Sequence, residues 1–256
     1  MTAVVKTNPA APAGFFEAEA AGLRWLADAE ARGGARVARV DEVGPGRIAI
    51  RRVAPARPDA AAARAFGAAL ARTHDAGAAA FGAAADGWTG PNFIGRLAQA
   101  CVPTDAWGVF YARDRVAAFL PGARDAGNLG AADTRVVERA CELVGSGVFD
   151  DTDPPARLHG DLWSGNVLWS PGGVVMIDPA AHGGHGETDL AMLALFGCPF
   201  LDEIVAGYQD VHPLPAGRDD RVPVHQLHPL AVHAVGHGRA YGAALADAAL
   251  RTLALA

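Results

Sequence analysis

Three residues with oxygen-bearing side chains, Asp161, Asn166 and Asp178, lie close together in the sequence. Carboxylate and amide oxygens are the ligands that a hard cation such as Mg²⁺ prefers, and a carboxylate can also accept the proton of an alcohol. An aspartate, an asparagine five residues later and then a second aspartate are the equipment of kinase-type phosphoryl transfer. In that chemistry Asp161 accepts the proton of the substrate hydroxyl, while Asn166 and Asp178 hold Mg²⁺ on the nucleotide phosphates.

The residues between Asn166 and Asp178 predict a local structure that brings these two side chains together. Val167–Trp169 and Val174–Ile177 are β-branched and aromatic runs, and the turn sequence Ser-Pro-Gly-Gly separates them. Folded as an antiparallel hairpin, they place Asn166 opposite Asp178. Each residue taken alone could simply cap a turn or end a strand, but the full spacing favours the functional interpretation.

The elements predicted around this hairpin are strands and one helix before it, and mostly helices elsewhere. We expect a strand over residues 2–7, a helix over 15–32, and strands over 35–40 and 47–53 on either side of the turn Gly44-Pro45-Gly46. Residues 54–58 contain two prolines and form the predicted linker. Beyond it, helices are predicted over residues 59–74, 106–120 and 134–148.

The composition of the 256 residues, 51% hydrophobic and 20% charged, fits a soluble globular protein that can bury a core. The net charge of −6 argues against a nucleic-acid partner. No apolar run reaches the ~20 residues needed to span a bilayer and no secretory signal is present, so we expect a cytoplasmic protein without a membrane partner. Three cysteines, far apart and odd in number, favour reduced core thiols over disulfides or zinc.

Lys6 is the only lysine among 22 basic residues, and the others are arginines. Where any positive charge would serve, this sequence uses arginine, so a single lysine indicates a need for the compact charge that binds nucleotide phosphates. A chance surface residue near the terminus is the alternative, and on Lys6 alone it is the better explanation.

Several stretches of the sequence resemble the fructosamine kinase family, a relative of the aminoglycoside and choline kinases. The central ones are HGDLWSGN from His159 to Asn166, IDPA from Ile177 to Ala180 and GHGETDLAMLALFG from Gly184 to Gly197. The relatives share HGD and the later Asn and Asp, whereas the tryptophan of DLWSGN and the IDPA stretch are typical of the fructosamine kinase branch. Further similar segments are FEAEAAGL (16–23), GAALARTH (67–74), NFIG (92–95), Trp107 with Phe110 and Arg115, and a C-terminal region with HQL, His233 and Tyr241.

The resemblance implies an α+β, two-lobed protein-kinase-like fold with ATP in the cleft between the lobes. The N-terminal nucleotide-binding lobe would span residues 1–53, the linker 54–58, and the larger, mostly helical catalytic and substrate-binding lobe 59–256. Lys6 would bind the phosphates with Glu19 as its helix-borne partner, although Glu17 could take this place if the helix starts differently. His159 and Asp189 would support the catalytic loop.

Two aromatic residues are candidates for contacts with the acceptor. Trp163 follows Asp161 by two positions and could form a wall of the acceptor pocket or, equally well, belong to the core. The resemblance marks His233 as a substrate-side residue. His225, His228, His233 and His237 lack a known metal-ligand pattern, and His185 carries little weight as a Mg²⁺ ligand, because imidazole is not its usual partner.

The sequence departs from the family pattern at its start, where only five residues precede Lys6. Kinases of this fold carry a hairpin with a glycine-containing phosphate loop before the lysine strand. Either the true start codon lies further upstream or the protein lacks this loop. The sequence as given predicts an N-terminal lobe without it, with weak ATP binding and slow turnover.

The resemblance implies ATP-dependent phosphorylation of a hydroxyl of a ketosamine or glycated amine, of the fructosamine or ribulosamine type, in glycation repair, with ATP and Mg²⁺ as cofactors. One alternative is a nucleotide-binding pseudokinase with little turnover. Another is a kinase for a different alcohol, such as an aminoglycoside or choline. An acidic acceptor pocket would favour a polycationic aminoglycoside, whereas an aromatic wall with few carboxylates would favour the ketosamine.

Overall fold

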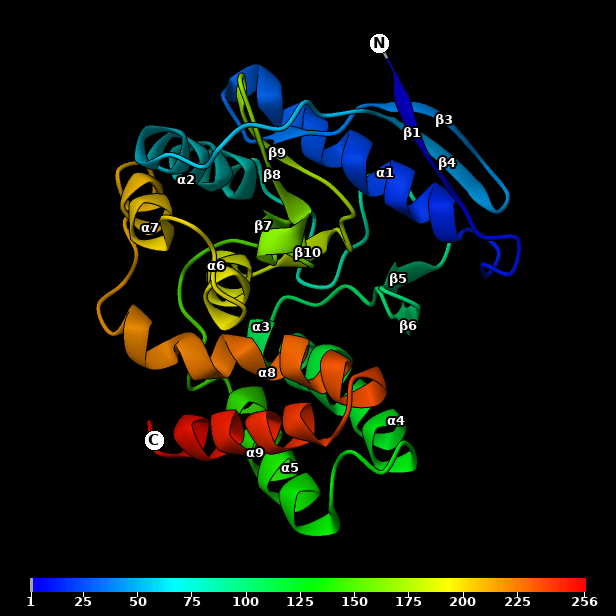
Figure 1. The fold of residues 1–256 in the computed structure, drawn as a ribbon. Coiled ribbons are helices and arrows are strands. Elements are labelled where there is room, and N and C mark those ends of the chain that lie inside the picture. The colour runs from blue at the N-terminus through cyan, green and yellow to red at the C-terminus, as the bar shows by residue number, and fades with distance from the viewer. Residues whose placement is uncertain (1) are drawn as a thin grey trace.

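A three-stranded antiparallel sheet with one long helix packed against it forms the N-terminal part of the computed structural model, which describes residues 2–256 (Figure 1). The strand order is β1 (Ala3–Thr7), β4 (Arg47–Arg51) and β3 (Val40–Gly44). Lys6 pairs with Ile48 of the central strand, and the Ile48 side chain is buried. Because side chains alternate between the faces of a strand, Lys6 shares the inner face of β1 with Val4, which packs against the core.

Helix α1 (Phe15–Ala27) lies against this sheet and confirms the predicted helix. Phe16, Ala20 and Leu23 recur at helical spacing and are buried, so one face of the helix belongs to the core. The helix continues as the 3₁₀ segment η1 (Asp28–Arg32) and ends at Gly33, whose φ of 80° is the left-handed conformation typical of a glycine C-cap. Glu19 is carried on the part of α1 that faces Lys6.

The strand predicted over residues 35–40 is correct only in part, because the strand found there is shorter than predicted and belongs to a different sheet. The strand that pairs with β4 is Val40–Gly44, because a loop of only Pro45 and Gly46 joins Gly44 to Arg47 and fixes the register next to the turn. Arg36 and Val37 instead form β2 (Arg36–Val37), which pairs in parallel with β9 in another sheet. The upstream residues therefore tie the N-terminal part to the second half of the chain.

The hairpin predicted around Asn166 and Asp178 is confirmed. Strands β8 (Val167–Ser170) and β9 (Gly173–Met176) pair antiparallel, with Ser170 opposite Gly173 at the turn. At the other end, the N–H of Ile177 donates to the carbonyl oxygen of Asn166 at 3.1 Å, which carries the pairing one step beyond the strands. The polar residues at both ends of the hairpin are thus held side by side.

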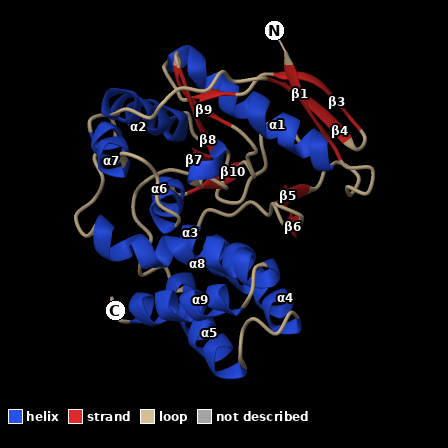
Figure 2. Ribbon diagram, viewed as in Figure 1, coloured by secondary structure: helices blue, strands red, loops and turns tan. Residues whose placement is uncertain are grey.

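Helices make up most of the remaining chain, which also contains short strands that the sequence did not predict. The helices are α2 (Ala60–Asp75), α3 (Trp107–Phe110), α4 (Leu120–Asp125), α5 (Ala131–Gly145), α6 (Gly186–Leu195), α7 (Leu201–Gln209), α8 (Arg218–Gly236) and α9 (Arg239–Leu253). The unpredicted strands are β5 (Asn92–Ile94) with β6 (Leu97–Gln99), and β7 (Ala156–Leu158) with β10 (His182–Gly184). Figure 2 shows that the strands gather on the side of α1, whereas α4, α5, α8 and α9 lie together on the opposite side.

The single helix predicted over residues 106–120 is interrupted in the structure. After α3 the backbone widens into the π-helix η2 (Tyr111–Val116), tightens into the 3₁₀ segment η3 (Ala117–Phe119) and then becomes α4. Pro121 sits in the first turn of α4, where its missing N–H costs nothing. π-segments are rare and occur mostly at sites under a special constraint, and this one carries the fully buried Arg115.

Two clusters of buried apolar side chains hold these elements together. The first joins α1 and the N-terminal sheet to α2, α7 and the β8–β9 hairpin, through residues such as Leu23, Leu70 and Met176. The second lies among η2, α4, α5, α8 and α9. The division into lobes at residues 54–58 stays a prediction. Among the described residues, no helix is long and apolar enough to cross a membrane.

We predict that Gly67→Ala destabilises the fold, because Gly67 of α2 lies against the backbone of α7. A Cβ atom at this position would lie 1.8 Å from the carbonyl oxygen of Ile204, so the two helices would have to separate. The expected loss is about 1–3 kcal/mol in the free energy of unfolding, measured by urea denaturation. Gly236→Ala is the matched control, since a Cβ at Gly236 meets nothing within 4 Å and should be neutral or slightly stabilising. Equal stability of the two variants would contradict this packing.

Candidate functional site

A cavity of about 390 Å³ lies where β1, α1, the β5–β6 hairpin and the loop from His159 to Asn166 meet. Six of the nine site residues predicted from the sequence line it, namely Lys6, Glu19, Asp161, Trp163, Asn166 and Asp178. His159 and Asp189 are buried at 1% exposure, and they contact the backbone of the loop. His233 is not among the residues that line the cavity.

Lys6 joins the N-terminal sheet to the end of the β8–β9 hairpin. Its ammonium group donates to Oε1 of Glu19 at 2.7 Å and also contacts the carboxylate of Asp178. Burial alone would lower the pKa of Lys6, but the two carboxylates outweigh this effect and raise it. Burial raises the pKa of Glu19, and Lys6 opposes that rise. Of the two glutamates considered from the sequence, Glu19 is the one that forms the ion pair.

Asn166 uses its amide nitrogen to fix the conformation of the loop. Nδ2 donates to the carbonyl oxygen of Asp161 at 2.8 Å and to the carboxylate of Asp161 at 3.2 Å. The amide oxygen of Asn166 is then the atom that can serve as a metal ligand. Asp178 has a φ of 55°, an uncommon conformation for a residue other than glycine, and such strain tends to occur at functional sites.

The loop is anchored from below by the buried carboxylate of Asp189 on α6. Its two oxygens accept the backbone N–H groups of His159 at 2.8 Å and Gly160 at 3.0 Å. Nε2 of His74, a residue to which the sequence assigned no role, lies 3.2 Å from the same carboxylate. Burial would raise the pKa of Asp189, but the contact with His74 and the donated N–H groups lower it, so Asp189 stays ionised.

His159 connects the two segments that carry Asp161 and Asp178. Nε2 donates to the carbonyl oxygen of Ile177 at 2.8 Å, and Nδ1 accepts the backbone N–H of Asp161 at 3.2 Å. These roles require the neutral imidazole with its proton on Nε2, and burial keeps the pKa of His159 below its ordinary value. The position of Asp161 relative to the hairpin end is therefore set by a buried, uncharged side chain.

Asp161 is the group in the cavity whose ionisation is most strongly perturbed toward neutral pH. Burial raises its pKa to about 7, the negative charges of Asp178 and Asp189 add to the rise, and the hydrogen bond from Asn166 opposes it. A carboxylate with a pKa near the working pH is well matched to the task of a general base.

The charges that line the cavity do not balance. Three carboxylates, those of Glu19, Asp161 and Asp178, face the single ammonium group of Lys6. One divalent cation would compensate the remaining negative charge, and the oxygen ligands of Asn166 and Asp178 suit a hard ion. The donor set therefore fits a divalent metal.

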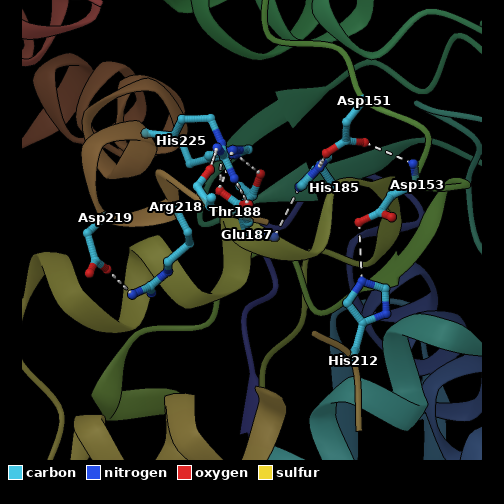
Figure 3. Close-up of polar contacts among 11 residues, drawn as sticks. Asp151, Asp153, His185, Glu187, Thr188, His212, Arg218, Asp219 and His225 are labelled. Atoms are coloured by element: carbon cyan, nitrogen blue, oxygen red, sulfur yellow. Dashed lines mark hydrogen bonds and ion pairs between the residues drawn. The ribbon is translucent and has the colours of Figure 1, made fainter. Parts of the chain in front are cut away.

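A second group of potential metal ligands, Asp151, Asp153 and His185, lies elsewhere in the structure (Figure 3). Their ligand atoms all lie within 4.8 Å of one another. Nδ1 of His185 accepts the N–H of Glu187 at 3.2 Å, so the proton is on Nε2, which donates to Asp151 at 3.0 Å. A metal would need the lone pair of that same Nε2. Hydrogen bonds therefore explain why Asp151 and His185 lie close together without a metal. None of the three residues lines the cavity around Asp161.

The predicted acceptor residues occupy different places. Trp163 lines the cavity and is 41% exposed. His233 packs on Phe196 with ring centroids 4.9 Å apart, and Phe196 in turn meets the edge of Trp163 at 6.3 Å. Sequence reasoning gave Phe93 of β5 and Phe15 of α1 no role in the site, although both line the cavity. Phe93 lies in the family-like NFIG segment, and this was a usable signal.

Comparison with known proteins supplies an assignment independent of the geometry. The family model for fructosamine kinases matches residues 2–254. The chain is 33% identical over 243 residues to a protein described as a ketoamine kinase from Enterococcus faecium, a match that covers 93% of this chain and 83% of the relative.

Solved structures agree with this match. A crystal structure described as a fructosamine-3-kinase from Thermobifida fusca has a TM-score of 0.90 and 43% identity, and the match covers 98% of this chain and 85% of that chain. Choline kinase LicA from Streptococcus pneumoniae has a TM-score of 0.61 at 15% identity, with coverages of 99% and 86%. At that identity the second likeness shows the fold alone. The predicted α+β, protein-kinase-like fold is confirmed.

We predict that Asp161→Asn is more stable than the unmodified protein at neutral pH when nucleotide and metal are absent. Folding raises the pKa of Asp161 from 3.8 to about 7, so the folded state binds this proton more tightly than the unfolded state. The stability that the proton contributes is fully present below about pH 4 and is lost as the pH rises through 7. Asparagine carries no charge and escapes this loss.

Urea denaturation at a series of pH values measures the difference in the free energy of unfolding. The difference should grow between about pH 4 and pH 7 and stay constant above. Asp219→Asn is the control, because the Asp219 carboxylate is 91% exposed. A difference for Asp161→Asn that does not change with pH would contradict the raised pKa.

Proposed function

The chain belongs to the fructosamine kinase family, and we propose that it transfers the γ-phosphoryl group of ATP to a hydroxyl of a ketosamine, with Asp161 as the general base. Membership makes the protein an ATP-dependent phosphotransferase that works with a divalent metal. The observation that carries the residue assignment is the convergence of Lys6, Asp161, Asn166 and Asp178 on one cavity.

In the proposed reaction the oxygen of the substrate hydroxyl attacks the γ-phosphorus, its proton passes to the carboxylate of Asp161, and ADP leaves. Lys6 pairs with the nucleotide phosphates and is held in place by Glu19. Asn166 and Asp178 would hold the metal, which we propose to be Mg²⁺ and which neutralises phosphate charge. Little covalent chemistry falls to the protein, so orientation of the hydroxyl toward Asp161 supplies most of the effect.

The walls of the cavity support a ketosamine as acceptor. The carboxylates that line the cavity are those of Glu19, Asp161 and Asp178. Each already has a proposed role: Glu19 pairs with Lys6, Asp161 accepts the proton of the hydroxyl, and Asp178 holds the metal. Polycationic aminoglycosides would need further acidic groups, whereas the remaining walls include the aromatic rings of Phe93 and Trp163. Aromatic faces suit the carbon skeleton of a sugar. We propose fructosamines and ribulosamines as the acceptors. Phosphorylation of these adducts would give the protein a role in glycation repair.

The direct test is to incubate the protein with ATP, Mg²⁺ and a panel of acceptors, and to identify products by mass spectrometry. We expect ADP and a phosphorylated ketosamine from fructosamines or ribulosamines, and no phosphorylated product from an aminoglycoside or choline. Phosphorylation of choline or an aminoglycoside instead would refute the acceptor class. Binding of ATP without any product would identify a nucleotide-binding protein with little turnover.

We predict that Asp161→Asn lowers kcat by about 10² to 10⁴ and leaves the Kd of ATP nearly unchanged, because the base acts on the acceptor hydroxyl and not on the nucleotide. Steady-state kinetics and calorimetric titration with ATP measure the two quantities. Asp219→Asn again serves as the exposed control, with kcat close to that of the unmodified protein. A comparable loss of ATP affinity in Asp161→Asn would show that Asp161 acts through the structure of the loop.

A further inference from the structure

A row of partly exposed rings continues outward from the cavity. It begins at Trp163, passes to Phe196 at a centroid distance of 6.3 Å, and from there to His233 at 4.9 Å. Tyr241 lies 5.0 Å from His233 and 6.4 Å from Phe196, and His237 lies 4.9 Å from His233. We call Phe196, His233, His237 and Tyr241 the outer aromatic row. Each ring touches the next, so the surface is continuous from the cavity.

Three separate elements supply the outer aromatic row. Phe196 follows the last turn of α6, His233 lies in the last turn of α8 and His237 just after it, and Tyr241 lies in the first turn of α9. Figure 1 shows that α8 and α9 lie side by side, and residues of the two helices contact each other along this interface. Residues distant in sequence have thus been brought to one surface beside the cavity.

The exposure of these rings distinguishes them from core aromatics. Phe110 and Tyr111 in the second core cluster are 1% exposed, as packing alone requires. Phe196, His233 and Tyr241 are only half-buried, and His237 is exposed. Single exposed apolar side chains are ordinary on a protein surface, but a contiguous patch of them marks a place where a ligand or partner binds.

Hydrogen bonding orients the central ring of the row. Nδ1 of His233 donates to the carbonyl oxygen of Pro229 at 2.7 Å, one helical turn earlier. This contact fixes the plane of the imidazole and leaves Nε2 as the atom that can accept a hydrogen bond from a ligand. Burial and the nearby His237 keep the pKa of His233 below its ordinary value, so the imidazole of His233 is neutral at pH 7.

The size of the cavity determines which part of an acceptor can reach the row. Its volume of about 390 Å³ must hold the terminal phosphates and the reacting sugar, whose hydroxyl has to lie at Asp161. The group carried by the amine is the part of a ketosamine that varies in size, and a large one must leave the cavity. Trp163 is a wall of the cavity and lies next to Phe196, the first ring of the outer aromatic row, so this surface offers a continuous path outward.

We infer that Phe196, His237 and Tyr241 bind the group carried by the amine of the ketosamine, and that they select flat, apolar substituents. The inference rests on the proposed function. It adds that the group carried by the amine determines which ketosamine the protein prefers. A stacked or edge-on aromatic contact contributes to affinity beyond the area it buries. The four side chains of the row include no carboxylate, so a polycationic substituent finds no countercharge there.

The test compares two acceptors that differ only in this substituent, the fructosamine of phenethylamine and the fructosamine of methylamine. We expect kcat/KM to be about tenfold higher for the phenethylamine adduct, the range that one aromatic contact provides. Calorimetric titration of both adducts, without ATP, should show the same order of affinity. Equal kcat/KM and equal Kd for the two adducts would overturn the inference.

Variants locate the preference on the row. In Tyr241→Ala and in His237→Ala the ratio of kcat/KM between the two adducts should fall toward one, and Phe196→Leu gives a third reading with a smaller loss of packing. Leu250→Ala, a 55% exposed position on α9 away from the row, is the matched control and should keep the tenfold ratio. A preference that survives all three row variants would also overturn the inference.

The two levels of the proposal fail in different ways. If neither these two fructosamines nor the ribulosamines of the acceptor panel yield a phosphorylated product, the proposed function is wrong. If both are phosphorylated at equal rates and bind equally, the proposed function stands and only the assignment of the outer aromatic row is wrong.

Discussion

The geometry of the whole site depends on one buried carboxylate, that of Asp189. Its oxygens accept the N–H groups of two successive residues, His159 and Gly160, and it also contacts His74 on α2. Removal of this acceptor would leave two buried backbone N–H groups without partners, at a cost of about 1–3 kcal/mol each. Asp161 follows these residues directly. The position of the proposed base therefore depends on Asp189, a residue that does not line the cavity.

The cavity itself opposes folding, and the surrounding structure has to compensate. Three carboxylates gather around one lysine, and the raised pKa of Asp161 shows that its ionised form is disfavoured there. The first apolar cluster packs beneath this loop and its hairpin through Leu162, Val167 and Met176, all nearly inaccessible to water. This arrangement is typical of sites in which function is retained at the expense of stability. Binding of a divalent cation would relieve the repulsion.

The parts of the site that are formed by residues close together in the sequence could be predicted from local patterns. The β8–β9 hairpin could be predicted because its turn and its two β-branched runs are contiguous, and the ends of the hairpin fix Asn166 and Asp178. The pairing of β2 with β9 could not, because it joins Arg36 to Val175 across the chain and leaves no local pattern. The contacts of His74 and Phe196 were missed for the same reason, although both residues lie in segments that resemble the family.

The proposed base and the outer aromatic row pack against different apolar clusters. Asp161 lies on a loop packed over the first apolar cluster, whereas Tyr241 packs against the second, among α5, α8 and α9. Phe196 is the link, because it follows α6, the helix that also carries Asp189. Changes on α9 can therefore alter the surface beyond Trp163 without moving the contacts that hold the loop. Preference for one amine-borne group over another can then vary among kinases of this fold while the phosphoryl-transfer geometry stays the same.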